Sequence, residues 1–139
     1  VLGALDAVTK EVVTVVNSAY INSLSVCALL EKLATLRPTL PITVVLDNAR
    51  YQRCALVQTC AAKLKIELLF LPAYSPNLNL IERLWKFVKK QCLYAKYYRD
   101  FDSFTSAIER CLREAHTIHA NALQSLLSLN FQTFQKVQL

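Results

Sequence analysis

Apolar and polar positions divide the first part of the chain into two strands and a helix. Val1 to Val8 and Val12 to Asn17 are rich in β-branched residues and are joined by the polar segment Thr9 to Glu11, which predicts an antiparallel hairpin. From Asn22 to Leu36 apolar residues recur at helical spacing, and Pro38 follows the last of them. A helix that covers one face of the sheet is therefore expected there.

The middle of the chain continues as an α/β succession. Ile42 to Leu46 is short and apolar, which favours a central parallel strand that ends at Asp47. Arg53 to Lys65 is the next predicted helix, and Ile66 to Leu71 is the next predicted strand. The connection from Pro72 to Asn79 contains two prolines and two asparagines, which is typical of a rigid, irregular link.

Helical periodicity dominates the remainder. A long helix is predicted from Leu80 to about Tyr97, and its core stripe consists of Ile81, Leu84, Trp85 and Val88. Further amphipathic helices are expected from Phe101 to about Leu112 and around Ala120 to Phe131. The order of elements predicts a single α/β domain over residues 1–139, with right-handed crossovers.

Composition narrows the function classes. A chain of 139 residues with 54% hydrophobic content suffices for one packed domain, and its net charge of +6 suits a polyanionic partner. Apolar runs short of about 18 residues and the lack of a basic leader argue against a membrane span or signal peptide. A single glycine excludes a glycine-rich nucleotide loop. An odd number of cysteines without CxxC pairing predicts buried, reduced thiols in a cytoplasmic setting: Cys27, Cys54, Cys60, Cys92 and Cys111.

Two carboxylates are the candidate catalytic residues. Asp47 closes a strand, and Glu82 lies in the first turn of a helix, so the two can meet at a sheet edge and hold a divalent ion. Phosphodiester chemistry is the natural expectation. Each residue also has a structural alternative, because Asp is common in turns and Asn79 to Glu82 has the spacing of a capping box.

The segments around these carboxylates resemble a known family. Val44-Val-Leu-Asp-Asn-Ala-Arg-Tyr51 and the pattern Tyr-Ser-Pro-x-x-Asn-x-x-Glu-x-x-Trp, from Tyr74 to Trp85, resemble the catalytic domain of IS630/Tc1/mariner-type DDE transposases, with 34 residues between Asp47 and Glu82. The resemblance covers most of the chain to about Tyr97. It implies a ribonuclease-H-like core over about residues 1–97, a mixed sheet flanked by helices, with C-terminal helices over about 98–139.

In that family three carboxylates bind two divalent ions, normally Mg²⁺ with Mn²⁺ as a substitute, and DNA is cut at transposon ends and joined to a target. Asp47 and Glu82 match the second and third acids. The strand that carries the first acid has no counterpart, because Gly3 to Leu5 resembles the second strand. The fold should then lack its first, central strand, something upstream of Val1 should be missing, and this chain alone should be inactive. Asp6, beside the Thr9 to Glu11 turn, is interpreted as a hairpin residue.

The sequence departs from the family pattern at two positions and leaves other functions open. Gln52 stands where the family often has His, and Leu80 where it often has Pro. A non-catalytic remnant that binds DNA or a protein partner is therefore the alternative. A more distant one is a signalling domain with Asp47 as phosphoacceptor. The resemblance also implies a nucleoid-associated location in a bacterial-type host; a homodimer is a further expectation, and a membrane or small-molecule partner is not expected.

Basic and aromatic side chains near the carboxylates are candidate DNA contacts. Each lysine or arginine could equally belong to a solvated helix face. The candidates are Arg50, Arg53, Lys86, Lys89 and Lys90. Tyrosines near the end of the long helix could stack on bases but more often complete a core, and an HxxH pair is interpreted as surface histidines rather than a zinc site. These residues are Tyr94, Tyr97, Tyr98, His116 and His119.

Overall fold

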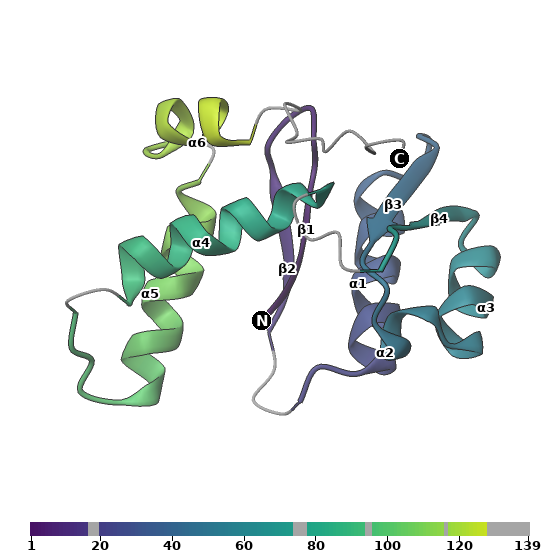
Figure 1. The fold of residues 1–139 in the computed structure, drawn as a ribbon, viewed down its shortest axis with the longest axis horizontal. Coiled ribbons are helices and arrows are strands. Elements are labelled where there is room, and N and C mark those ends of the chain that lie inside the picture. Colours follow the sequence, from purple (N-terminus) through teal and green to yellow (C-terminus); the bar gives the residue numbers. More distant parts are fainter. Residues whose placement is uncertain (17–19, 74–77, 94–95, 116, 128–139) are drawn as a thin grey trace, which may run out of the picture.

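The computed structural model shows two small sheets flanked by helices, a mixed α/β structure (Figure 1). It describes residues 1–16, 20–73, 78–93, 96–115 and 117–127. Strands β1 (Leu2–Leu5) and β2 (Val12–Val15) form the predicted antiparallel hairpin, with Leu2 opposite Val15. Strands β3 (Ile42–Leu46) and β4 (Ile66–Phe70) form a separate parallel pair. Within the described residues, β1 and β3 each have a strand neighbour on one side only.

The turn of the hairpin is organised by Asp6. Its carboxylate oxygen Oδ1 accepts hydrogen bonds from the main-chain N–H groups of Thr9, at 2.9 Å, and Val8, at 2.8 Å. These bonds, that of Thr9 foremost, hold the pKa of Asp6 below its ordinary value of 3.8. Lys10 adopts the left-handed backbone conformation, with φ of 65°. The interpretation of Asp6 as a hairpin residue is thus confirmed.

Replacing Asp6 by Ala should destabilise the fold by about 0.5–1 kcal/mol at neutral pH, a modest value because the carboxylate is partly solvated. The lowered pKa means that this stabilisation is present above pH 3.8 and is lost as pH falls through the folded-state value. Urea unfolding at pH 7 and pH 3 measures the difference. Asp6→Asn is the matched control because its amide oxygen can still accept both bonds; an equal loss for both variants would contradict this account.

Helix α1 (Ser23–Leu36) packs beside both sheets. Asn22 caps it, accepting from the Ser25 N–H at 3.2 Å in a capping box. A buried cluster joins α1 to α3 (Ala55–Lys63) and to the parallel pair: Val26, Cys27, Leu30, Val57, Ala61 and Ile66. Leu2 of β1 and Val44 of β3 also pack against this cluster. Helix α1 therefore contributes to a core that contacts both sheets.

The other face of the hairpin is covered by three later helices. They are α4 (Leu80–Cys92), α5 (Phe101–Arg113) and α6 (Ala120–Leu126). Their core contains Leu84, Val88, Cys92, Cys111, Leu112, Ala115, Leu123 and Leu127, with Leu5 and Val12 of the hairpin against it. Figure 1 shows the hairpin between this helical layer and the layer of α1, β3, β4 and α3. The predicted core stripe of α4 is confirmed, since Ile81 and Trp85 also pack there.

Several predicted boundaries are wrong. The helix predicted from Arg53 to Lys65 is α3, which begins at Ala55 because Cys54 is extended, with φ of −66° and ψ of 160°, and which ends at Lys63. The one-turn helix α2 (Arg50–Arg53) before it was not predicted. The helix predicted to run to Tyr97 ends at Cys92, because the chain must turn back for α5 to pack on α4. Helix α6 ends at Leu126, and residues 128–131 of its predicted range lie outside the described part.

The prediction that Ile42 to Leu46 is a fully covered central strand is also wrong for this chain. Its side chains alternate between half-buried and exposed, with Val45 43% exposed, and Leu69 on β4 is 51% exposed. The physical reason is that α1 and α3 cover one face of the parallel pair, while the opposite face stays open to solvent. Apolar composition predicted burial on both faces, but the packing provides it on one.

All five cysteines are free thiols, as predicted. Cys27, Cys92 and Cys111 are buried, whereas Cys54 and Cys60 are partly exposed. Burial, together with the neighbouring Cys92 thiol, raises the pKa of Cys111 to about 12. Burial and the neighbouring Cys60 raise that of Cys27 to about 11. These two thiols therefore stay protonated and unreactive at neutral pH. No helix in the described part of the chain is long and apolar enough to cross a membrane.

Candidate active site

Asp47 lies where β3 ends, beside the end of β4. The Leu71 N–H donates to the Leu46 carbonyl at 2.8 Å, which carries the pairing of the two strands to this edge. Asp47 follows directly and is half-buried. Its Oδ1 accepts from the Ala49 N–H at 3.3 Å and from the side-chain amide of Gln52 at 2.5 Å. The carboxylate is therefore held by short-range contacts on one of its two oxygens.

Arg53 is fixed at the same edge. Its Nη1 donates to Asn48 Oδ1 at 2.5 Å, and its guanidinium lies 5.4 Å from the centre of the Phe70 ring. These contacts orient the guanidinium, although the side chain as a whole is exposed. Arg50, the first residue of α2, is also exposed. Both arginines thus follow Asp47 within six residues, and Arg53 contacts Asn48, the residue after Asp47.

Glu82 lies in the first turn of α4 and is half-buried. Asn79 caps this helix, but its Oδ1 accepts from the Ile81 N–H at 3.4 Å rather than from the Glu82 amide. Among the described residues, no hydrogen bond ties the Glu82 carboxylate back to Asn79, so the capping-box alternative is not realised. The carboxylate is consequently available for another partner.

Gly3 determines how closely α4 approaches the hairpin. A Cβ atom at this position would lie 3.0 Å from two carbon atoms of the Trp85 indole and 3.6 Å from Ile81 Cδ1. Glycine allows this close approach, because even a Cβ atom would make an unusually tight contact and the indole ring would have to shift to accept it. Trp85 thus packs the first turns of α4 onto β1, and that contact sets the position of Glu82 relative to the sheet.

The lysines of α4 lie on the face that carries Glu82. Lys86, Lys89 and Lys90 follow Glu82 by four, seven and eight residues and are all exposed, while the apolar stripe faces the core. They form a basic strip along the helix, which is the arrangement expected for contact with a polyanion. Such a strip is also compatible with a solvated helix face.

Asp47 and Glu82 provide hard oxygen ligands of the type that Mg²⁺ or Mn²⁺ prefers. Their chemistry fits a divalent ion, but in the described residues no three His, Cys, Asp or Glu side chains gather closely enough to hold one. Two carboxylates alone are fewer than the three side chains of such a cluster.

The other candidates are dispersed. Tyr98 packs edge-on against Phe104, with ring centres 5.5 Å apart, and is half-buried, whereas Tyr97 is 91% exposed. His119 lies 3.9 Å from a Glu114 carboxylate oxygen and packs against Phe87. Tyr94 and His116 lie outside the described residues, as do positions 74–77 of the motif.

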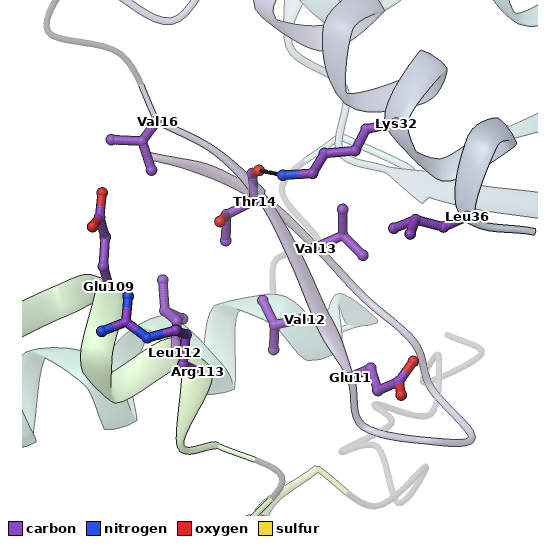
Figure 2. A pocket seen from close by; sticks show the side chains of 10 residues that line it. All are labelled: Glu11, Val12, Val13, Thr14, Val16, Lys32, Leu36, Glu109, Leu112 and Arg113. Atoms are coloured by element: carbon purple, nitrogen blue, oxygen red, sulfur yellow. Dashed lines mark hydrogen bonds between the residues drawn. The ribbon is translucent and has the colours of Figure 1, made fainter.

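A groove lies on another part of the molecule. It has a volume of about 740 Å³ and runs along β2 between α1 and α5 (Figure 2). Figure 2 shows Lys32 donating to the Thr14 carbonyl, a bond of 2.8 Å, at the outer edge of β2. The lining residues are Glu11, Val12, Val13, Thr14, Val16, Lys32, Leu36, Glu109, Leu112 and Arg113. None of them is a predicted site residue.

Comparison of the sequence with models of known protein families assigns the chain to a family. Residues 1–105 match the family model described as DDE superfamily endonuclease. The chain belongs to this family. The match includes the hairpin, Asp47, Glu82 and the whole of α4, and it ends within α5. No curated protein and no solved structure matches the chain significantly. Membership of this family indicates a transposase-type nuclease.

Sequence reasoning missed two contacts of this DDE endonuclease domain. The hydrogen bond from the Gln52 amide to Asp47 joins residues five apart, across the start of the one-turn helix α2. This spacing matches neither the helical nor the strand period, so no sequence pattern predicts the bond. The contact of Arg53 with Phe70 depends on the pairing of β3 with β4. The one signal in the sequence was that Gln52 stands where the family often has His.

Proposed function

We propose that the chain is the catalytic core of an IS630/Tc1/mariner-type transposase, a single domain that cleaves DNA at transposon ends and joins it to a target. The observation that carries the proposal is the pair of half-buried carboxylates, Asp47 and Glu82, within the segment that matches the DDE endonuclease family. Asp47 has one oxygen without a protein donor among the described residues, and Glu82 is not used as a helix cap. Both are thus available to a cation.

The fold is proposed to be ribonuclease-H-like once a strand lies between β1 and β3. Three observations support this: the two sheets are separate, each has a free edge among the described residues, and α1 packs against both. Unpaired strand edges readily accept another strand. A strand bearing an aspartate, from another segment of a longer protein or from a second copy in a homodimer, would join the sheets and bring the missing acid.

Asp47 and Glu82 would hold two divalent ions, normally Mg²⁺, with Mn²⁺ as a substitute. When bound, such ions activate the attacking oxygen and stabilise the leaving oxygen in phosphodiester cleavage. The chain's own contribution is to orient the two carboxylates, Asp47 by its contacts at the end of β3 and Glu82 by the packing of Trp85 on Gly3. Arg50, Arg53 and the α4 lysines would bind the phosphate backbone, and the substrate would place the protein at the nucleoid.

The decisive experiment restores the absent strand. The coding sequence is extended upstream until it includes an aspartate-bearing strand, and the protein is incubated with transposon-end DNA. Cleavage is expected with Mg²⁺ or Mn²⁺, and none with EDTA. The 139-residue chain alone is expected to be inactive under the same conditions. Cleavage by that short chain, lost in Glu82→Gln, would show that a third acid is not required.

A non-catalytic remnant is the second candidate, favoured by the lack of a three-ligand cluster in the described residues. A remnant would bind DNA or a partner and remain inactive even when the upstream segment is added. Metal-independent DNA binding without cleavage in the extended protein would decide for it.

Arg53 should contribute more to DNA binding than other exposed arginines, because its contacts with Asn48 and Phe70 already hold the guanidinium in place. Arg53→Ala is expected to weaken binding of duplex DNA by about tenfold. The slope of the logarithm of the binding constant against the logarithm of salt concentration should also fall by about one, which corresponds to one lost phosphate contact. Fluorescence anisotropy over a salt series measures both quantities. Arg99→Ala, an exposed arginine beyond α4, is the matched control; equal losses in the two variants would refute a specific contact by Arg53.

A further inference from the structure

The short helix α2 brings Gln52 back over the end of β3. The N–H groups of Gln52 and Arg53 both donate to the Ala49 carbonyl, at 3.0 and 3.1 Å, so the chain makes one tight turn directly after Asp47. Through this turn the Gln52 amide nitrogen reaches Asp47 Oδ1 at 2.5 Å and the Asp47 carbonyl oxygen at 3.1 Å. One side chain thus holds both the backbone and the carboxylate of Asp47.

The orientation of the amide follows from its neighbours. The opposite orientation would place the amide oxygen against two other oxygens of Asp47, neither of which can donate. With the nitrogen toward Asp47, the amide oxygen instead lies 3.4 Å from Tyr51 Oη, whose hydroxyl can donate to it. Both ends of the Gln52 amide then have suitable partners.

Burial makes this contact costly to lose. Gln52 is 8% exposed, and an amide donor buried without an acceptor loses its hydration with no compensating hydrogen bond. Moreover, Oδ1 receives both the Gln52 amide and the Ala49 N–H. Two donors on Oδ1 fix the rotation of the carboxylate, so the second oxygen, Oδ2, is the one directed to an external cation.

We propose that Gln52 is a positioning residue, which holds Asp47 Oδ1 through its amide and thereby presents Oδ2 to the divalent ion. The inference rests on the proposed function, since it assumes that Asp47 binds metal. Groups that orient a metal ligand typically change metal affinity by 10- to 100-fold when removed. Gln52 would act on the ion only through Asp47.

Binding of Mn²⁺ to the protein that includes the aspartate-bearing strand, followed by the electron paramagnetic resonance signal of free Mn²⁺, tests the proposal. Gln52→Leu keeps most of the side-chain volume but cannot donate, and it should weaken Mn²⁺ binding about tenfold. Gln52→His can donate through its imidazole N–H and should recover most of that loss. The matched control is Gln58→Leu, because Gln58 donates to the Arg53 carbonyl at 2.6 Å and does not touch Asp47.

Thermal unfolding of each variant separates positioning from stability. A lower unfolding midpoint for Gln52→Leu with unchanged Mn²⁺ affinity would mean that Gln52 is only structural. If Gln52→Leu does not fold, Gln52→Asn, whose amide is one methylene shorter, replaces it and should show the same loss of affinity. Asp47→Asn separates failure of this inference from failure of the proposed metal site. Mn²⁺ affinity that depends on Asp47 but not on Gln52 overturns this inference alone. Binding independent of Asp47 overturns the proposed metal site, and this inference with it.

Discussion

Asp47→Asn and Glu82→Gln should each reduce DNA cleavage by the strand-completed enzyme at least about a thousandfold, equivalent to about 4 kcal/mol of lost transition-state stabilisation. Each substitution keeps the size of the side chain and removes one negative charge. Neither residue is in the buried core, so the fold should persist. The expected loss therefore reports on chemistry and not on folding.

Single-turnover cleavage of labelled transposon-end DNA measures this effect, with circular dichroism to show that the variants fold. Glu67→Gln is the matched control, because Glu67 is an exposed carboxylate on β4 that accepts a hydrogen bond from Thr43 at 3.3 Å. It lies at the beginning of β4, away from the edge where Asp47 emerges. Full activity of Asp47→Asn would remove Asp47 from the catalytic centre, whereas loss in all three variants would point to a general effect of charge.

Gly3→Val should destabilise the domain by about 2–3 kcal/mol and also reduce cleavage. Intrinsic strand preference favours Val over Gly by up to about 1 kcal/mol, which opposes the effect. The collision is expected to win, because even a Cβ atom would lie 3.0 Å from the Trp85 ring and Val adds two methyl groups beyond it. Relief of the collision would push α4 away from β1 and move Glu82 with it.

A double-mutant cycle identifies the cause of that destabilisation. Trp85→Leu removes the indole that Gly3 faces, so Gly3→Val should cost much less in the Trp85→Leu background, with a coupling of about 1 kcal/mol or more. Urea unfolding at equilibrium provides all four stabilities. Additive effects in the cycle would show that Gly3 is needed for another reason than the indole.

The sequence predicted most elements because their apolar periodicities are local. The hairpin, α1, β3, β4 and α5 occur where the alternation and the helical spacing placed them. Errors arose where packing overruled local preference. Cys54 is extended and delays the start of α3 to Ala55, and α4 ends at Cys92 so that α5 can return along it.

By itself, the sequence determined the order of strands and helices, the positions of Asp47 and Glu82, and the motif that relates them to DDE endonucleases. Only the tertiary structure decided that the strands form two separate sheets, that Gln52 holds Asp47, and that Phe70 supports Arg53. The physical reason is that periodicity reports which face of one element is buried. Contacts between elements depend on the distances and angles at which those faces pack, and the order of residues alone does not specify these.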